Sequence, residues 1–473
     1  MEYYITAVRF PHLPESPNIA SMRLGLIMPV AALYRVFGHS EITYYGIPLL
    51  SAGLLSVSVF FVGYGLFNRR VGLIAAFWVQ LVPNLLLESG HLLPDLPSAA
   101  FYTAGIALLV GLYPINDRIK PLLKTNWGFF FAGLLFGWSY LSKEYIAVLF
   151  LLIPILFWAL KIPFKRLIPT AAGMLSILCL EMIIGQAYYQ NPLIRFLAAT
   201  PRETVGHIEM DVGLILKFFP RLLNRSGGIG TLILSVVGAI GSITMGLWRE
   251  RKFTLLFSWS AIFYLFFTLM GLLPFIFSWK DIVLLRLHKF RYWIPILPPL
   301  IIGGIAIVDL ALARLFGKFK LAEKMIQIRT VAILGLMMIL STWIGLDAVW
   351  NDQQFIRNGA DHYQELRAFL KENNTRVDTI WVTRDSRRGY ARILPIYTHT
   401  PWGKPIWEGR LKYMNTEDEY LRADEINVGY VIIDRNFNDP DLYDVPEYLS
   451  DIPANWKLAF ESENQKLALY AVE

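Results

Sequence analysis

The chain has 473 residues, of which 55% are hydrophobic and 17% are charged, and its net charge is +7. A soluble protein of this length carries more charge, and several apolar runs here are long enough to cross the roughly 30 Å hydrocarbon core of a bilayer. The composition therefore excludes a soluble protein, and the lack of basic runs interleaved with aromatic residues excludes a nucleic-acid partner. The single cysteine, Cys179, excludes a disulfide within the chain and a thiolate metal site.

Length and apolar content predict about ten transmembrane helices, so residues 1–347 are expected to form an α-helical polytopic membrane domain. The spans lie near residues 46–66, 71–87, 96–113, 127–141, 145–160, 167–187, 227–247, 253–275, 292–312 and 329–347. Residues 21–37 form a shorter amphipathic stretch, which predicts a helix lying at the membrane surface.

Basic and less basic connections alternate along the chain, and basic loops are favoured on the cytoplasmic side of a membrane. The basic connections are residues 68–70, 117–124, 161–166, 249–252 and 314–329. The remaining connections are therefore predicted to lie outside, namely residues 1–20, 88–95, 142–144, 188–226, 276–291 and those after about 348.

The composition becomes more polar after Trp350. A polar amphipathic helix is expected over 351–373, and a short helix over 416–425 with Thr416 as its N-cap. Apolar and β-branched runs predict strands at 378–383, 429–434, 456–460 and 467–472. Residues 348–473 are therefore expected to form a small extracytoplasmic α/β domain.

A first polar cluster, Glu88, His91 and Asp95, lies between two apolar spans at the predicted outer boundary of the membrane. Asp95 precedes Leu96-Pro97, which is also typical of a helix start with an acidic cap. Both interpretations, helix capping and a polar site, are open.

A second cluster lies at the tip of the hairpin formed by residues 127–160, where Ser142-Lys143-Glu144 leaves almost no room for a loop. The lysine could extend its charge to the interface, or it could face an anionic headgroup or a phosphate.

A third cluster, His288-Lys289-Phe290-Arg291-Tyr292, precedes a span on the predicted outer side. Arginine and aromatic residues often anchor helices at an interface, yet basic residues on the outer side need another reason. A phosphate would supply one, because the guanidinium of Arg291 can bind it through two parallel hydrogen bonds.

Glu2 precedes Tyr3-Tyr4 in the first outer segment and is either a solvated charge or a further acid of the site. An outward-facing crevice would then combine acids, which can deprotonate an acceptor hydroxyl, with cations, which stabilise a phosphate leaving group. This combination favours glycosyl transfer from a lipid-linked sugar phosphate.

The order of these features resembles the GT-C class of membrane glycosyltransferases, and within it the branch of protein O-mannosyltransferases and the aminoarabinose transferase of lipid A. The matching segments are Glu2-Tyr3-Tyr4, 21–37, 46–66, 68–70, Gly90 to Asp95, Gly137 to Lys143 and Arg291 to Pro295. The resemblance covers nearly the whole chain, although each motif is short.

The resemblance implies an inverting enzyme of cell envelope glycosylation, whose donor is a polyprenyl-phosphate sugar and whose acceptor is a lipid, a glycan or a protein. It assigns the catalytic roles to Glu2 and Asp95. The implied substrate-binding residues are Glu88, His91, Lys143, Glu144, His288, Lys289, Arg291 and Tyr292. The resemblance makes no cofactor certain, and a divalent metal ion stays open because members of the class differ in this respect. Glu88 and His91 are the candidates to bind one.

The family pattern places an aspartate in the first outer loop, after an N-terminal transmembrane helix. Here Met1 stands near the position of that aspartate, so we expect either a start that lies late in the full protein or a role for Glu2 as the replacing acid.

Two other functions fit a chain of this kind: a flippase or transporter of lipid-linked glycans, and an inactive scaffold if the N-terminal acid is absent. A transporter would carry polar groups in mid-membrane. In the outer domain, Trp402 and Trp407 could stack on sugars or simply contribute to packing.

Overall fold

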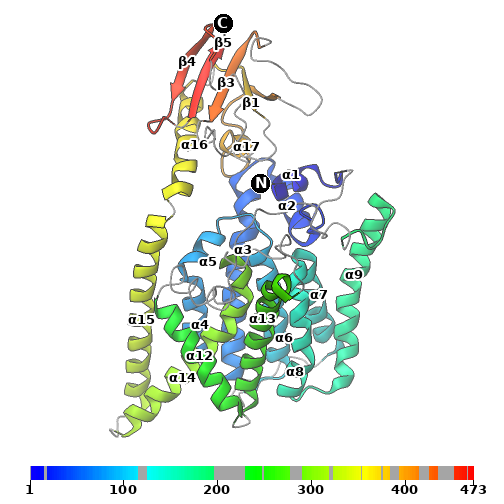
Figure 1. Ribbon diagram of the computed structural model, residues 1–473, viewed down its shortest axis with the longest axis vertical. Helices are drawn as coiled ribbons and strands as arrows, with labels where there is room; N and C mark the ends of the chain where they lie inside the picture. Colours follow the sequence, from blue (N-terminus) through cyan, green and yellow to red (C-terminus); the bar gives the residue numbers. More distant parts are fainter. Residues whose placement is uncertain are drawn as a thin grey trace. The chain divides into compact units, whose positions relative to one another are not determined.

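The computed structural model describes most of the chain (Figure 1). The described residues are 2–14, 19–115, 125–195, 229–247, 250–276, 290–318, 323–352, 354–373, 376–383, 394–414, 426–434, 452–465 and 467–472.

The chain forms two compact units. Unit 1 combines Met1–His12, Pro29–Gly46 and Asn351–Glu473, and unit 2 combines Leu13–Met28 with Ile47–Trp350. Unit 1 therefore contains the region of the expected C-terminal domain together with two N-terminal segments. Each unit is described by itself below.

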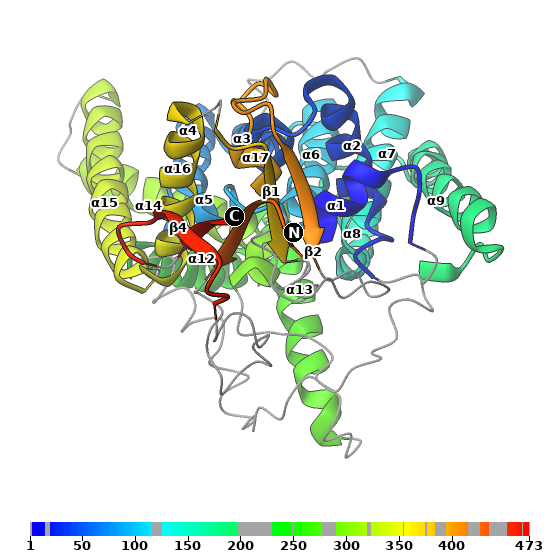
Figure 2. The same ribbon diagram turned by 90° about the horizontal axis from the view of Figure 1, so that it is seen from above.

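Unit 2 is built from helices, and Figures 1 and 2 show α9 and α15 on opposite sides of it with the other helices between them. The elements are α2 (Leu24–Phe37) and α3 (Glu41–Leu66), which both units share, α4 (Arg69–Gln80), α5 (Pro83–Glu88), α6 (Asp95–Leu112), α7 (Asn126–Ser142), η1 (Glu144–Leu151), α8 (Leu152–Ala159), η2 (Phe164–Arg166), α9 (Leu167–Tyr189), α12 (Ile229–Leu247), α13 (Arg251–Ile276), η3 (Phe290–Ile296), α14 (Leu297–Lys318) and α15 (Glu323–Asp352).

Within the described residues, six helices are long and apolar enough to cross a bilayer, and three shorter apolar helices accompany them. The predicted multi-helix membrane architecture is therefore confirmed, whereas the number of ten spans is not. The expected span at 71–87 is divided into α4 and α5 because Pro83 starts α5, and a proline inside a helix removes a hydrogen bond and clashes with the preceding turn. The expected span at 145–160 begins as the 3₁₀ helix η1.

Close contacts with α9 hold helix α7, which ends just before Lys143. A Cβ on Gly133 of α7 would lie 2.0 Å from the Thr170 carbonyl oxygen, and a Cβ on Gly173 of α9 would lie 2.1 Å from that of Phe130. Only glycine allows these backbones to approach so closely, as is common between membrane helices. Helix α7 therefore packs closely against α9, and this packing fixes the position of its C-terminal end next to Lys143.

Unit 1 contains a five-stranded sheet in the order β2-β1-β3-β5-β4. Strands β1 (Thr379–Thr383), β2 (Arg410–Met414) and β3 (Gly429–Asp434) are parallel, and β5 (Leu467–Val472) and β4 (Trp456–Glu461) continue the sheet in antiparallel pairs. Helix α16 (Gln354–Glu372) packs Tyr363, Leu366 and Leu370 into the core beside the sheet.

The four strands and the long helix predicted for the C-terminal region are confirmed. Strand β2 was missed, and α1 (Glu2–Arg9) and α17 (Leu394–Tyr397) complete the unit. The helix predicted over 416–425 lies outside the described residues. The small α/β region itself therefore agrees with the sequence pattern.

Candidate active site

Asp95 begins α6 and is 1% exposed, the environment in which a carboxylate needs partners most. Its Oδ1 accepts a hydrogen bond of 3.1 Å from the Tyr145 hydroxyl and lies 3.5 Å from Lys143 Nζ. Its Oδ2 lies 3.9 Å from Arg291 Nε. Helix α6, the α7–η1 junction and η3 therefore bring their polar residues to one buried cluster, which we call the Asp95 cluster: Asp95, Lys143, Tyr145, Arg291 and Tyr292.

The capping interpretation of Asp95 is wrong in this structure. Pro94 occupies the N-cap position of α6, and no side chain makes a capping hydrogen bond there. Instead, Asp95 lies in the first turn, where the helix dipole favours a negative charge. The carboxylate is therefore available to its two cations and to Tyr145.

Two serines hold the start of α6 against the end of α7. Ser98 Oγ donates to the Ser139 carbonyl at 2.9 Å, and Ser139 Oγ donates to the Ser98 carbonyl at 2.7 Å. Ser98 lies one turn after Asp95, and Ser139 lies one turn before Lys143. This reciprocal pair therefore sets the distance between the carboxylate and the ammonium.

Lys143 ends α7 because its backbone is extended, with φ −153° and ψ 123°. Its side chain is 4% exposed, and its Nζ lies 5.1 Å from the ring centre of Tyr292 and 5.6 Å from that of Tyr145. These cation–π contacts partly replace lost water. Burial lowers the pKa of Lys143 to about 8, although the negative charge of Asp95 opposes the shift.

Arg291 lies in η3 with its guanidinium 5.4 Å from the ring centre of Tyr292. Its side chain keeps 21% exposure, unlike that of Lys143. The buried Nε makes no hydrogen bond to any described residue, because 3.9 Å to Asp95 is too long. Arg291 therefore retains a donor and some access to the surroundings.

The charges of the Asp95 cluster do not balance. One carboxylate faces two cations, and neither ion pair is at hydrogen-bond distance. Glu144 and Glu88 act on Lys143 and Arg291 from outside this set, and Arg291 is partly exposed. Within the cluster itself, one cation of the two has no carboxylate of its own. The cluster is therefore suited to an anionic group such as a phosphate, which guanidinium and ammonium groups bind well.

A second network lies beside the first through Glu144. Its Oε1 accepts a 2.9 Å hydrogen bond from Arg23, and its Oε2 lies 3.4 Å from Arg195 Nη2. Arg195, 3% exposed, also pairs with Glu181 and donates to the Tyr140 carbonyl at 2.9 Å. Two carboxylates thus meet two arginines, and this network is balanced in charge.

Glu88 and His91 form a more exposed pair, with 3.8 Å between Glu88 Oε2 and His91 Nδ1. Within the described part of the chain, no group of three or more His, Cys, Asp or Glu residues could hold a metal ion.

The structure brings together Asp95, Lys143, Arg291 and Tyr292 among the predicted site residues, while Glu144 takes part in the neighbouring network. His288, Lys289 and the side chain of Glu2 lie outside the described residues. Sequence reasoning missed Arg23, Tyr145 and Arg195. Each arginine lies next to an apolar run, which is the only signal the sequence offers. Their shared partner Glu144 is 121 and 51 positions away, so the sequence pattern does not predict the contact.

Comparison with known proteins gives two further findings. The sequence profile of a family described as dolichyl-phosphate-mannose-protein mannosyltransferase matches residues 29–187. No curated protein sequence matches the chain.

Among solved structures, ArnT from Cupriavidus metallidurans in the apo state is 13% identical with a TM-score of 0.59, over 99% of this chain and 92% of that one. The same protein bound to undecaprenyl phosphate is 11% identical with a TM-score of 0.56, over 99% and 96%. The apo oligosaccharyltransferase from Archaeoglobus fulgidus is 13% identical with a TM-score of 0.50, over 100% and 70%. The fold is therefore GT-C-like, and the resemblance predicted from the sequence is confirmed.

Proposed function

We propose that this chain is a membrane glycosyltransferase that transfers a sugar from a polyprenyl-phosphate donor to a lipid, glycan or protein acceptor on the extracytoplasmic face. The observation that carries the proposal is the pair of cations that face the buried Asp95, namely the buried Lys143 and the partly exposed Arg291. The matching mannosyltransferase profile and the similar fold of a protein bound to undecaprenyl phosphate support it.

In this mechanism Lys143 and Arg291 hold the phosphate of the donor. As the bond between the sugar and the phosphate breaks, negative charge develops on the leaving phosphate. Cations that are already oriented stabilise this charge without reorganising, which lowers the barrier. The 21% exposure of the Arg291 side chain gives the lipid phosphate access to the guanidinium.

Asp95 acts as a positioning residue rather than as the base. Its Oδ1 is engaged by Tyr145 and Lys143, and its Oδ2 faces Arg291, so both oxygens point to groups of the protein. The base that accepts the acceptor's proton is then a separate acid; the sequence resemblance alone suggests Glu2, whose side chain lies outside the described residues.

The extracytoplasmic location of the site and of unit 1 rests on the distribution of basic loops. Asn68-Arg69-Arg70 and the other basic connections are assigned to the cytoplasmic side. The start of α6 is one helical passage away from residues 68–70, through α4 and α5. We therefore assign the Asp95 cluster to the opposite, outer boundary.

The test reconstitutes the full chain in liposomes with a polyprenyl-phosphate sugar labelled in the sugar, together with membrane extract as the source of acceptors. We expect label to leave the polyprenyl lipid and enter a new product, and to do so much more slowly with Arg291→Ala. Label that crosses the bilayer while it remains attached to the lipid would indicate a flippase. Neither release nor movement, with a folded chain and donor in excess, would favour a scaffold.

A further inference from the structure

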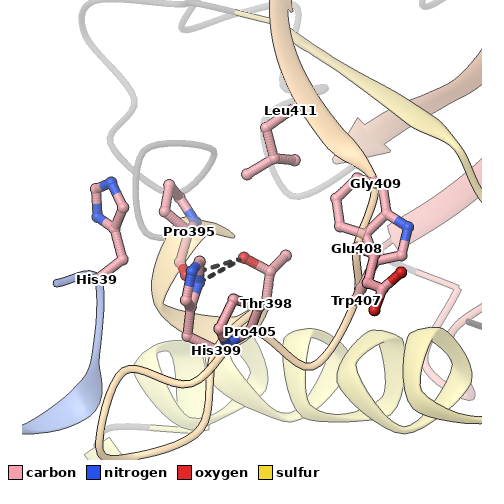
Figure 3. Close-up of a pocket in the computed structure, with 9 residues that line it drawn as sticks. All are labelled: His39, Pro395, Thr398, His399, Pro405, Trp407, Glu408, Gly409 and Leu411. Carbon is pink, nitrogen blue, oxygen red and sulfur yellow. Dashed lines mark hydrogen bonds between the residues drawn. The ribbon is translucent and has the colours of Figure 1, made fainter. Parts of the chain in front are cut away.

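Unit 1 contains a cavity of about 500 Å³ that the transfer mechanism does not use (Figure 3). Its lining residues are His39, Pro395, Thr398, His399, Pro405, Trp407, Glu408, Gly409 and Leu411. His39 comes from the turn between α2 and α3, Pro395 from α17, Leu411 from β2, and the others from the segment between α17 and β2. A cavity of this size lies within the usual range for small-molecule sites.

The walls of the cavity combine apolar surfaces with polar groups, of which one, Glu408, is acidic. Figure 3 shows Leu411, Trp407 and Glu408 across the cavity from His39. Thr398 supplies a hydroxyl and Glu408 a carboxylate, and neither lysine nor arginine is among the lining residues. An anion would find no cation here, whereas a ligand with one apolar face and several hydroxyl groups would find partners for both.

The two imidazoles are oriented by hydrogen bonds on one nitrogen each. His39 Nδ1 lies 3.0 Å from the Tyr4 hydroxyl, and His399 Nδ1 lies 2.6 Å from the Pro395 carbonyl and 3.1 Å from Thr398 Oγ1. Nε2 of each ring makes no such bond within the described residues. Burial, followed by the nearby His399, lowers the pKa of His39 to about 4, so this ring is neutral at physiological pH.

The loop that forms one side of the cavity is held rigidly. His399 and Pro405 pair as an antiparallel bridge, and the amide of Ile406 donates to the Thr398 carbonyl at 2.9 Å. At the tip of this loop, Trp402 is 69% exposed. A preformed site loses less conformational entropy on binding than a flexible one.

We propose that this cavity binds a neutral sugar unit. A pyranose ring has an apolar C–H face, which suits Pro405, Leu411 and the edge of the largely buried Trp407, and a rim of hydroxyl groups that both donate and accept. The Nε2 atoms of His39 and His399, with Glu408, supply the matching hydrogen bonds. The exposed Trp402 offers a second aromatic surface to a longer glycan. This proposal concerns binding alone, so it stands whether or not the chain transfers sugars.

The experiment titrates the full chain in lipid nanodiscs with methyl α-mannoside, methyl β-galactoside, chitobiose and sialic acid, using saturation-transfer NMR. We expect at least one neutral probe to bind and sialic acid to bind least. His399→Ala should weaken binding about tenfold, the loss expected from 1.4 kcal/mol of hydrogen bonding. Leu411→Phe, which fills the cavity without removing a polar group, should also weaken it.

His12→Ala is the matched control, because His12 is an exposed histidine of unit 1 that does not line the cavity. It should leave binding unchanged, and the melting temperature of each variant verifies that it is folded. The proposal is overturned if no neutral probe binds the folded chain, if sialic acid binds best, or if folded His399→Ala and Leu411→Phe bind as the parent does.

Discussion

Asp95 and Asp309 are both buried in unit 2, at 1% and 6% exposure, but their surroundings differ. Asp309 of α14 accepts a 3.1 Å hydrogen bond from Asn68 and lies 3.7 Å from Arg70 Nη1. Asn68 also caps α4, because its Oδ1 accepts a 2.9 Å hydrogen bond from the Val71 amide. Asp309 thus joins α14 to the start of α4, with one acid opposite one cation.

Asp95 instead faces two cations, at 3.5 and 3.9 Å, and is hydrogen-bonded by a tyrosine. The comparison teaches that a buried aspartate near an arginine does not by itself mark a site. The second cation is what distinguishes Asp95, and in the proposed mechanism the two cations together bind the donor phosphate. Matched substitutions in the two clusters can break or sharpen this distinction.

The largest difference is expected between Arg291→Ala and Arg70→Ala. The first removes an oriented donor to the leaving phosphate and should lower kcat/KM for sugar transfer by about 10²–10³-fold. The second should change kcat/KM by no more than about twofold. Arg70 is 30% exposed, and its ion pair with Asp309 has no part in the proposed mechanism. Radiolabel transfer from the polyprenyl donor measures both. Equal losses of kcat/KM in the two variants would contradict the distinction between the surroundings of Asp95 and of Asp309.

A smaller difference is expected between Asp95→Asn and Asp309→Asn. Removing a group that orients an active-site residue typically costs about 10- to 100-fold in activity, which we expect for Asp95→Asn. Asp309→Asn should lower the melting temperature and preserve kcat/KM of the folded fraction.

Asp95→Asn also leaves the buried Lys143 and the partly exposed Arg291 without their acid, which can prevent folding. The double variant Asp95→Asn with Lys143→Met restores a single cation, so it should fold and still transfer poorly. A folded double variant with the parent's activity would contradict the assigned roles.

The pH dependence of kcat/KM should be governed by Lys143 of the Asp95 cluster. Lys143 has a pKa of about 8 instead of 10.5, so its charge is lost as the pH rises through 8. We expect kcat/KM to fall up to about tenfold per pH unit above that point, since kcat/KM reports the free enzyme. Between pH 8 and 10.5, Lys143 binds more protons in the unfolded chain than in the folded chain. Through this group the free energy of unfolding therefore increases as the pH rises, so unfolding does not explain the loss of kcat/KM.

Lys143→Arg is the control for this profile, because arginine keeps its charge across the range. Its alkaline limb should move to higher pH, even if its overall rate is lower. An unchanged limb would show that a different group titrates near pH 8.

The smallest effect is expected for Asn68→Ala, which removes the cap of α4 and one partner of Asp309. Loss of an N-cap costs about 1 kcal/mol of stability. Thermal unfolding in nanodiscs should therefore shift slightly downward, while kcat/KM remains that of the parent. A large loss of transfer would place the Asp309 cluster in the mechanism.

The helices could be predicted from the sequence because long apolar runs must be buried in lipid or protein. The strands could be predicted because residues 429–434 and 467–472 have short, regular strand patterns. The division of 71–87 at Pro83 was readable in principle, since proline at the first helical position starts a new helix. The sequence did not predict the 3₁₀ helix η1, because its residues are equally compatible with an α-helix.

The convergence of Asp95, Lys143 and Arg291 followed from their placement at helix ends on one predicted side of the membrane. Tyr145 and Arg195 could not be foreseen in the same way, because side-chain direction depends on packing. Tyr145, for example, reaches Asp95 because the rings of Phe267 and Tyr292 lie 5.3 and 5.9 Å from its own.

The most direct test of the central claim is a structure of the full chain in nanodiscs with bound polyprenyl phosphate. The phosphate should lie within about 4 Å of both Lys143 Nζ and the Arg291 guanidinium, the range of a direct ion pair. A phosphate bound anywhere else, with Lys143 and Arg291 still facing only Asp95, would contradict the assignment of this cluster as the donor site.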